Sequence, residues 1–205
     1  MPAATEHGHA AIARSELPVD TIELARYLIG KLVLRAAPEG VLCGRIVETE
    51  AYPVEDAAGH AYRGQTPRNR VLFGPRGHAY VYLAYGVSYM LNVSSEAEGT
   101  GAGVLIRALE PLEGVEAMRR NRGGVQSLRD LARGPGRLAA ALDIDLRLNG
   151  MDLCRAGPLC LAPGAGDAPE IGTSTRIGIS RDVDRLLRFY ARGSRFVSGP
   201  TALNR

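Results

Sequence analysis

Apolar positions near the start of the chain repeat first with the period of a helix and then with that of strands. Residues 17–30 carry apolar side chains three and four positions apart, with Asp20 placed as an N-cap and Gly30 as a stop, so they predict a helix. Residues 31–35 and 41–52 are rich in β-branched residues and predict a hairpin. The second of these strands is long and carries polar residues that an ordinary buried strand would not.

The pattern further along the chain predicts more strands and then helices. Residues 56–77 are rich in Gly, Pro and Arg and predict a long loop, which in a compact domain is usually functional or disordered. A second hairpin that turns near Gly86 is expected from residues 78–85 and 89–95, followed by a buried strand at residues 104–109. Three helices are expected at residues 112–122, 127–132 and 137–142. A final strand or two are expected at residues 176–180 and 187–192.

Length and composition limit the architecture. A chain of 205 residues, 45% apolar and 23% charged, can bury a substantial core but is short for two domains. Strands clustered early and helices later predict an α+β fold in a single mixed domain over residues 16–205, after a disordered tail over residues 1–15. No run has the length of a membrane span, and the start lacks the order of a secretory signal.

Three cysteines, Cys43, Cys154 and Cys160, are an odd count without the spacing of a disulfide framework or a zinc site. A cytoplasmic protein with no structural metal is therefore expected. The net charge of +3 does not by itself indicate a polyanionic partner. The 24 arginines beside the single lysine, Lys31, would suit phosphate contacts and stacking on bases, but a GC-rich coding bias explains most of this excess.

Two carboxylates share one face of the long second strand. Side chains alternate along a strand, so Glu48, Glu50 and Tyr52 project together. These residues alone favour a solvated outer face of an antiparallel sheet over a functional one. Arg107, in the apolar run GVLIRAL, must be paired if it is buried, and Glu50 would satisfy it. Such a pair could be structural, or it could hold a water molecule.

Tyrosines are concentrated on the second hairpin of a chain that has no tryptophan and only 5% aromatic residues. Tyr80 and Tyr82 share a face, and Tyr85 lies next to the turn at Gly86. An apolar side chain on a protruding hairpin can push between stacked bases, but a tyrosine here could equally fold back onto the sheet.

A turn over residues 134–137, with the sequence GPGR, leads directly into a helical pattern. Free backbone N–H groups beside the Arg137 cation would form a plausible phosphate site. The signal is weak, because Pro and Gly commonly begin helices.

The segments GRIVETEAYPVEDAAGHAYRGQTPRNRVLFGPRGHAYVYLAYGVSYMLNVSS, GAGVLIRALEPLEG, GPGRLAAAL and RFYARGS together resemble the 3-methyladenine (alkyladenine) DNA glycosylase family, over residues 17–198. The resemblance implies a curved antiparallel sheet with flanking helices and a DNA-intercalating hairpin. It implies a monofunctional enzyme of base excision repair that flips alkylated or deaminated purines, such as 3-methyladenine, hypoxanthine and etheno-adenine, and leaves an abasic site. The expected partner is double-stranded DNA, bound by a monomer in the cytoplasm, associated with the nucleoid and without a cofactor or metal.

The same resemblance implies the catalytic residues. Glu50, the second glutamate of ETEAY, resembles the general base that activates water. Arg107 and the main-chain carbonyl of Ala191 resemble the groups that help to hold that water. The pocket for the flipped base, with one residue that crowds a guanine amino group (Asn92), is expected from Tyr52, His60, Tyr82 and Asn92.

The resemblance also implies the DNA contacts. Tyr85 resembles the intercalating wedge, and segments that touch the DNA backbone contain Arg68, Arg137, Gly193 and Ser194. The chain departs from the family pattern in two places. Arg137 stands where many members have lysine, and the stretch between Tyr52 and His60 is one residue shorter than in some relatives.

Two other classes of function are also compatible with these residues. A non-catalytic nucleic-acid-binding module could use the same tyrosines and arginines for stacking and phosphate contact. Alternatively, Glu50, Asp56 and His60 could ligate a catalytic metal, although no recognisable metal spacing is present. Glycosylases that also nick the strand use an amine nucleophile. Lys31 lies far in sequence from the expected pocket, so hydrolysis by water without nicking is expected.

Overall fold

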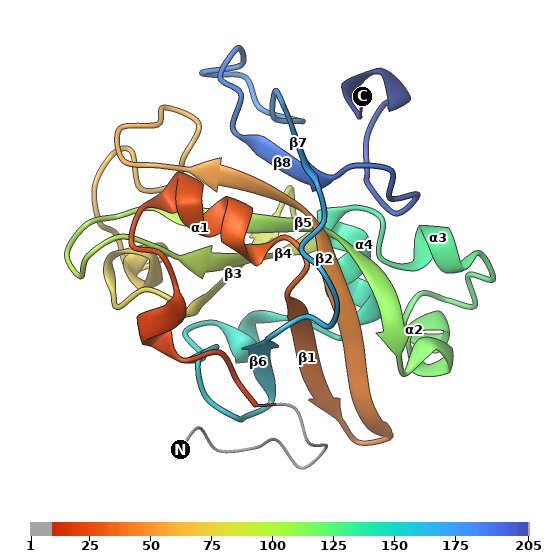
Figure 1. Cartoon of the computed structure of the whole chain (residues 1–205). Coiled ribbons are helices and arrows are strands. Elements are labelled where there is room, and N and C mark those ends of the chain that lie inside the picture. The colour runs from red at the N-terminus through yellow and green to blue at the C-terminus, as the bar shows by residue number, and fades with distance from the viewer. Residues whose placement is uncertain (1–9, 205) are drawn as a thin grey trace.

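A curled antiparallel sheet carries most of the core in the computed structural model, which describes residues 10–204 (Figure 1). The strands are β1 (Leu32–Ala37), β2 (Gly40–Tyr52), β3 (Ala79–Ala84), β4 (Ser88–Ser94), β5 (Gly103–Glu113), β6 (Leu159–Ala162), β7 (Ile171–Ser174) and β8 (Arg188–Ala191). The α-helices are α1 (Thr21–Leu28), α2 (Val115–Asn121), α3 (Leu128–Leu131) and α4 (Pro135–Ala141). Short 3-10 turns lie at η1 (Arg14–Glu16), η2 (Arg70–Phe73), η3 (Leu146–Leu148) and η4 (Thr201–Leu203). The mixed α/β architecture with a curved antiparallel sheet confirms the predicted fold class.

Strand β2 is the centre of this sheet, whose order is β3-β4-β5-β2-β1-β6. Strand β5 pairs along one edge of β2. The other edge changes partner, because β1 pairs with residues 40–45 and β8 pairs with residues 48–50. The β2–β5 register also shifts on both sides of Glu48, as at a β-bulge. The end of β2 that carries the two glutamates is therefore enclosed by strands from distant parts of the chain.

The first helix and both hairpins confirm the local predictions. The Asp20 side chain accepts hydrogen bonds from the backbone N–H groups of Ile22 and Glu23, both at 2.9 Å, and so caps α1. The helix is shorter than predicted, since it ends at Leu28. Of the predicted tail, residues 1–9 lie outside the described residues. Ile12 is buried, and its N–H donates to the carbonyl of Leu161.

One predicted boundary and one predicted strand are wrong. The helix expected from residue 112 begins only at Val115, because β5 continues to Glu113 and Gly114, at φ +68°, makes the break. The strand expected at residues 176–180 is a loop that follows β7. There the backbone N–H of Ile177 bonds a carboxylate instead of a strand, and Gly178 has φ +79°. Strand β6 was not predicted; it is four residues long and pairs with β1.

The helices cover the sheet and complete the core. Helix α1 packs against β2 and β5, while α4 packs against β4 and β5. Their buried apolar residues join one main hydrophobic cluster, and a smaller cluster lies around β1 and β6. Within residues 10–204 no helix combines the length and the apolar character that crossing a membrane requires.

Candidate active site

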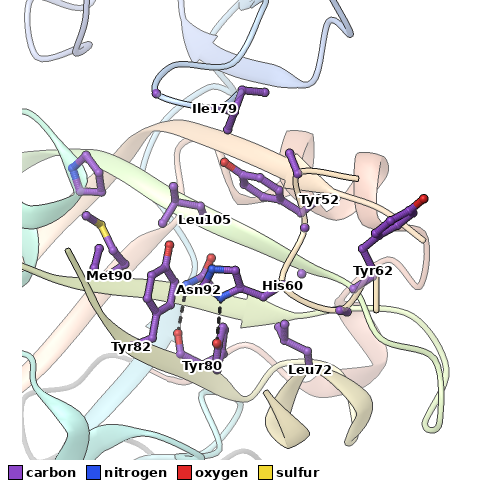
Figure 2. A pocket seen from close by; sticks show the side chains of 18 of the residues that line it. Tyr52, His60, Tyr62, Leu72, Tyr80, Tyr82, Met90, Asn92, Leu105 and Ile179 are labelled. Atoms are coloured by element: carbon purple, nitrogen blue, oxygen red, sulfur yellow. Dashed lines mark hydrogen bonds between the residues drawn. The ribbon is translucent and has the colours of Figure 1, made fainter. Parts of the chain in front are cut away.

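A cavity of about 520 Å³ opens beside the ends of β2, β3 and β4. Its volume lies in the usual range for small-molecule sites. Figure 2 shows Tyr52 on one side of the cavity and Tyr82, His60 and Tyr80 on the opposite side. The residues that line it include Tyr52, His60, Tyr80, Tyr82, Asn92, Arg107 and Ile177. All four expected pocket residues therefore lie together.

Three aromatic rings form one wall of the cavity. The His60 ring centre lies 4.4 Å from that of Tyr82, and the Tyr82 ring lies 5.4 Å from that of Tyr80. His60 Nδ1 is hydrogen-bonded to the Tyr80 hydroxyl at 2.9 Å, and the Asn69 side chain holds the His60 carbonyl at 2.8 Å. Burial and the nearby Arg68 cation lower the pKa of His60, so its imidazole is neutral at pH 7.

Glu50 lies directly behind this cavity and is fully buried. Its carboxylate accepts hydrogen bonds from the Tyr52 hydroxyl at 2.9 Å and the Ile177 N–H at 2.7 Å, and it pairs with Arg107 Nη1 at 3.1 Å. All three partners line the cavity. Burial raises the pKa of Glu50, although Arg107, Ile177 and Tyr52 act in the opposite direction. A buried carboxylate with a raised pKa is suited to accept a proton.

The solvated face that the residues of β2 alone favoured is wrong. Glu48 and Glu50 are both fully buried, because β8, the segment before Gly178 and Ser198 fold over them. The predicted pairing of Arg107 with Glu50 is present, and Arg107 also donates to Glu48 at 3.0 Å.

The structure does not bring Ala191 to Glu50. In the β2–β8 pairing Arg188 lies opposite Glu50, so Ala191 lies three residues further along β8. It lines a second cavity of about 510 Å³, together with Gly193 and Ser194, that shares no lining residue with the first. The main chain at Glu50 is that of Ile177, whose carbonyl also lies 3.5 Å from Arg107 Nη1. A role carried by backbone atoms left no signal in the side-chain pattern.

The hairpin β3–β4 holds an aromatic side chain out into solvent. Tyr85 is 90% exposed and adopts φ +51°, and Gly86 follows at φ +71°. The turn is closed by a 3.0 Å hydrogen bond from the Val87 N–H to the Ala84 carbonyl. A tyrosine in this conformation costs roughly 1 kcal/mol or more and gains nothing from burial, so folding stability does not explain its presence. The alternative in which Tyr85 folds back onto the sheet is wrong.

Arg68 and Arg137 lie on either side of this hairpin. Arg68 donates to the carbonyl of Leu83 at 3.4 Å, and its guanidinium lies 5.7 Å from the centre of the Tyr82 ring. The start of α4, which carries Arg137, packs closely against the first residue of β4. A Cβ added at Gly136 would lie 2.8 Å from the Ser88 hydroxyl. Arg137 is half exposed and pairs with Asp130 at 3.3 Å. Two exposed cations thus accompany the protruding tyrosine.

A buried ion pair that the sequence pattern did not indicate supports the other wall of the cavity. Arg176 contacts Asp56 through both terminal nitrogens, at 2.6 and 3.1 Å, and donates to the Ala51 carbonyl at 3.0 Å. Its guanidinium lies 4.7 Å from the centre of the Tyr52 ring. The pair therefore fixes both Tyr52 and the start of the loop that carries His60.

The same contacts weigh against a metal held by Glu50, Asp56 and His60. Asp56 is bound to Arg176, Glu50 to Arg107, and His60 to Tyr80. The part of the chain that the structure describes contains no cluster of three or more His, Cys, Asp or Glu side chains suited to a metal ion.

Comparison with known proteins agrees with the family resemblance of the sequence. Residues 15–195 match the family model described as Methylpurine-DNA glycosylase (MPG). A relative from Mesorhizobium japonicum is 73% identical over 95% of this chain and 93% of its own length. Relatives from Paraburkholderia phytofirmans (52% identity, 94% of this chain, 90% of its own) and Methanoculleus marisnigri (49% identity, 87% of this chain, 94% of its own) are also similar. The names of all three contain the words 3-methyladenine DNA glycosylase.

Proposed function

Because the chain belongs to the methylpurine-DNA glycosylase family and is a DNA glycosylase, we propose that it flips a damaged purine out of duplex DNA into the cavity beside Glu50 and hydrolyses its N-glycosidic bond. Inside the duplex no side chain reaches that bond, so the base must first leave the stack. The observation that supports this most strongly is the buried Glu50 carboxylate, bonded to three groups of the cavity wall.

The cavity suits a flat purine. Tyr52 on one side and Tyr82 with His60 on the other can stack on both faces of a base. A methylated adenine is a cation and is attracted to the electron-rich tyrosines. We propose hypoxanthine and etheno-adenine as further substrates; these neutral bases require protonation as they leave.

Asn92 supplies discrimination against guanine in this proposal. Its side chain is 7% exposed, lines the cavity and donates to the Tyr80 carbonyl at 3.1 Å. A polar group fixed in this way would crowd the 2-amino group that guanine has and adenine lacks. Replacement by the smaller serine should therefore admit more guanine lesions.

The chemistry needs a nucleophilic water and stabilisation of positive charge on the sugar. As the bond breaks the sugar becomes oxocarbenium-like, and the Glu50 carboxylate stabilises this charge and takes the proton of the water. Arg107 and the Ile177 carbonyl, which lie beside Glu50, complete the site for that water. In this proposal Ile177 has the role that the family resemblance implied for Ala191.

Tyr85 fills the gap that the flipped base leaves in the stack. In Tyr85→Ala, the single-turnover rate of excision from a correctly paired lesion should fall, because nothing then occupies the gap. The fall should correspond to the loss of roughly a few kcal/mol in the stability of the flipped state. The free energy of unfolding should change by less than about 0.5 kcal/mol, because the side chain is 90% exposed. Single-turnover excision and denaturant unfolding measure the two effects.

The matched control for Tyr85 is Leu146→Ala, which removes another exposed apolar side chain, on η3 and outside the cavity wall. It should leave excision unchanged. The Tyr85→Ala defect should also shrink on mispaired lesions, which are already loose. Equal losses on paired and mispaired lesions would contradict the wedge.

Arg68 and Arg137 contact phosphates in this proposal. Replacing either with alanine should weaken binding to all duplexes alike and reduce the slope of log K against log salt by about 1, since one fewer counterion is released. Arg155→Ala is the control, because Arg155 is highly exposed and pairs with Asp152 away from the cavity. An unchanged slope in the Arg68 and Arg137 variants would show that neither residue touches DNA.

The proposed function is tested by the release of free base. Duplex DNA that contains 3-methyladenine or hypoxanthine is incubated with the protein in excess chelator, and the free base is quantified. Release is expected. Binding without release would support a nucleic-acid-binding module, and release that the chelator abolishes would support a metal site.

A further inference from the structure

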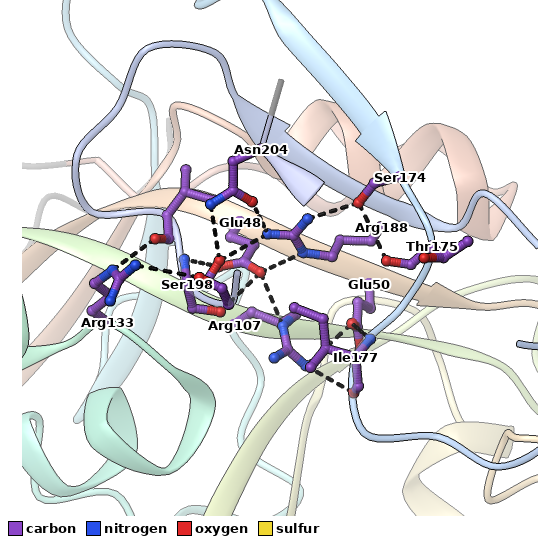
Figure 3. Close-up of polar contacts among 12 residues, drawn as sticks. Glu48, Glu50, Arg107, Arg133, Ser174, Thr175, Ile177, Arg188, Ser198 and Asn204 are labelled. Atoms are coloured by element: carbon purple, nitrogen blue, oxygen red, sulfur yellow. Dashed lines mark hydrogen bonds and ion pairs between the residues drawn. The ribbon is translucent and has the colours of Figure 1, made fainter. Parts of the chain in front are cut away.

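A second buried carboxylate lies behind the first, and the mechanism above does not use it. Glu48 accepts hydrogen bonds from Arg107 Nε at 3.0 Å, Arg188 Nε at 2.6 Å, and the N–H and hydroxyl of Ser198 at 2.6 and 3.0 Å (Figure 3). It is fully buried and does not line the cavity. Of its partners only Arg107 lines the cavity, whereas all three partners of Glu50 do, so Glu48 reaches the cavity wall only through Arg107.

Arg107 links the two carboxylates. Its Nε contacts Glu48 at 3.0 Å and its Nη1 contacts Glu50 at 3.1 Å. The guanidinium is planar and rigid, so fixing one nitrogen on Glu48 sets the direction of the other toward Glu50 and the cavity. Arg188 is in turn held on the far side of Glu48, by Ser174 at 2.7 Å.

The charges of this network balance. Glu48 and Glu50 supply two negative charges, and Arg107 and Arg188 supply two positive charges. If Glu48 were neutral, the Arg107 cation would act on Glu50 alone and would lower the pKa of Glu50 further. A carboxylate stabilised in this way is a weaker base.

We propose that Glu48 is a positioning residue for the glycosylase reaction, which acts through Arg107: it aims the guanidinium at Glu50 and the water, and it shares the arginine charge so that Glu50 remains a base. This inference rests on the proposed hydrolysis by Glu50. It assigns a role in the reaction to a residue that has no contact with the cavity.

The titration behaviour of the two groups agrees with this assignment. Burial alone would raise the pKa of Glu48, but Arg107, Arg188 and Ser198 outweigh it and hold the pKa below the usual value. Glu48 thus stays charged while Glu50 titrates. The groups that face Glu50 are Arg107 from β5, Tyr52 and Glu48 from β2, and the Ile177 N–H, with Arg188 opposite on β8.

The test is the pH dependence of single-turnover base release from methylated duplex DNA by Glu48→Gln. The plateau rate should fall by about tenfold to a hundredfold, because Arg107 is misplaced. The acid limb should move to lower pH, because one negative charge beside Glu50 is gone. The dissociation constant for DNA should be unchanged. Glu48→Asp keeps the negative charge, so its acid limb should return part of the way toward the wild-type pH.

Ser198→Ala is the matched control, since it removes one hydrogen bond to Glu48 but no charge. Its acid limb should stay where the wild type has it. If Glu48→Gln fails to fold, Glu48→Gln combined with Arg188→Gln keeps the network neutral and is measured in the same way. A wild-type rate and pH profile in the folded variant, with only a lower melting temperature, would overturn the proposal. Failure of the proposed function would differ, since the wild type itself would release no base.

Discussion

Replacing Glu50 by glutamine should lower the single-turnover rate of base release on the order of 10²-fold or more. The amide keeps the shape of the side chain: its oxygen can still accept the hydrogen bond of the Ile177 N–H, and its NH2 group can donate to the Tyr52 hydroxyl in place of accepting from it. It cannot take a proton from water, and it carries no charge to stabilise the sugar. Rates are measured by quenched reactions with enzyme in excess over lesion DNA, and binding by titration of the same duplex.

The control is Glu110→Gln, a carboxylate on β5 that pairs with Arg45 at 3.3 Å and does not line the cavity. It should retain wild-type rates. In Glu50→Gln, folding and lesion binding should persist, so the loss lies in the chemical step. Near-normal turnover in Glu50→Gln would instead show that a group other than Glu50 activates the water.

Replacing Arg176 by methionine should lower the free energy of unfolding by about 3–5 kcal/mol, because it leaves the Asp56 carboxylate buried without its main partner. Methionine fills most of the volume, so the lost charge dominates the effect. Denaturant unfolding measures the change. The double variant with Asp56→Leu should recover most of the loss, because no charge then remains buried.

The matched control is Arg155→Met, which breaks an exposed pair with Asp152 and should cost less than about 1 kcal/mol. A loss in Arg176→Met no greater than that of the control would contradict the expectation. It would show that Arg185, 3.4 Å from Asp56, satisfies this carboxylate by itself.

Elements whose signals are local were predictable from the sequence. The cap at Asp20, the two hairpins and the turn at Gly86 each depend on residues within a few positions of one another. The boundary at Leu112 was not predictable in this way, because β5 continues to Glu113 by pairing with β2, opposite Cys43. Pairing with a strand distant in sequence therefore outweighed the local helical pattern at these residues.

The candidate site likewise has features that local sequence predicts and features that depend on distant residues. The alternation of β2 placed Glu48 and Glu50 on one face, and that of β3 placed Tyr80 beside Tyr82. The burial of the carboxylates was not predictable, because the groups that cover them come from residues 174–198, more than 120 positions away along the chain. Ile177 acts through its main chain, so its side chain carries no sign of the role.

The proposed nucleophile is water and not a protein amine, and a reducing agent present during turnover distinguishes the two. Lys31, the single lysine of the chain, lines the second cavity and lies 4.5 Å from the centre of the Tyr27 ring, so it does not reach the lesion cavity. Borohydride added while the protein excises 3-methyladenine should trap no covalent protein–DNA adduct and should leave an intact abasic strand. Robust trapping that disappears in Lys31→Ala would contradict this account and would require an amine to act on the sugar.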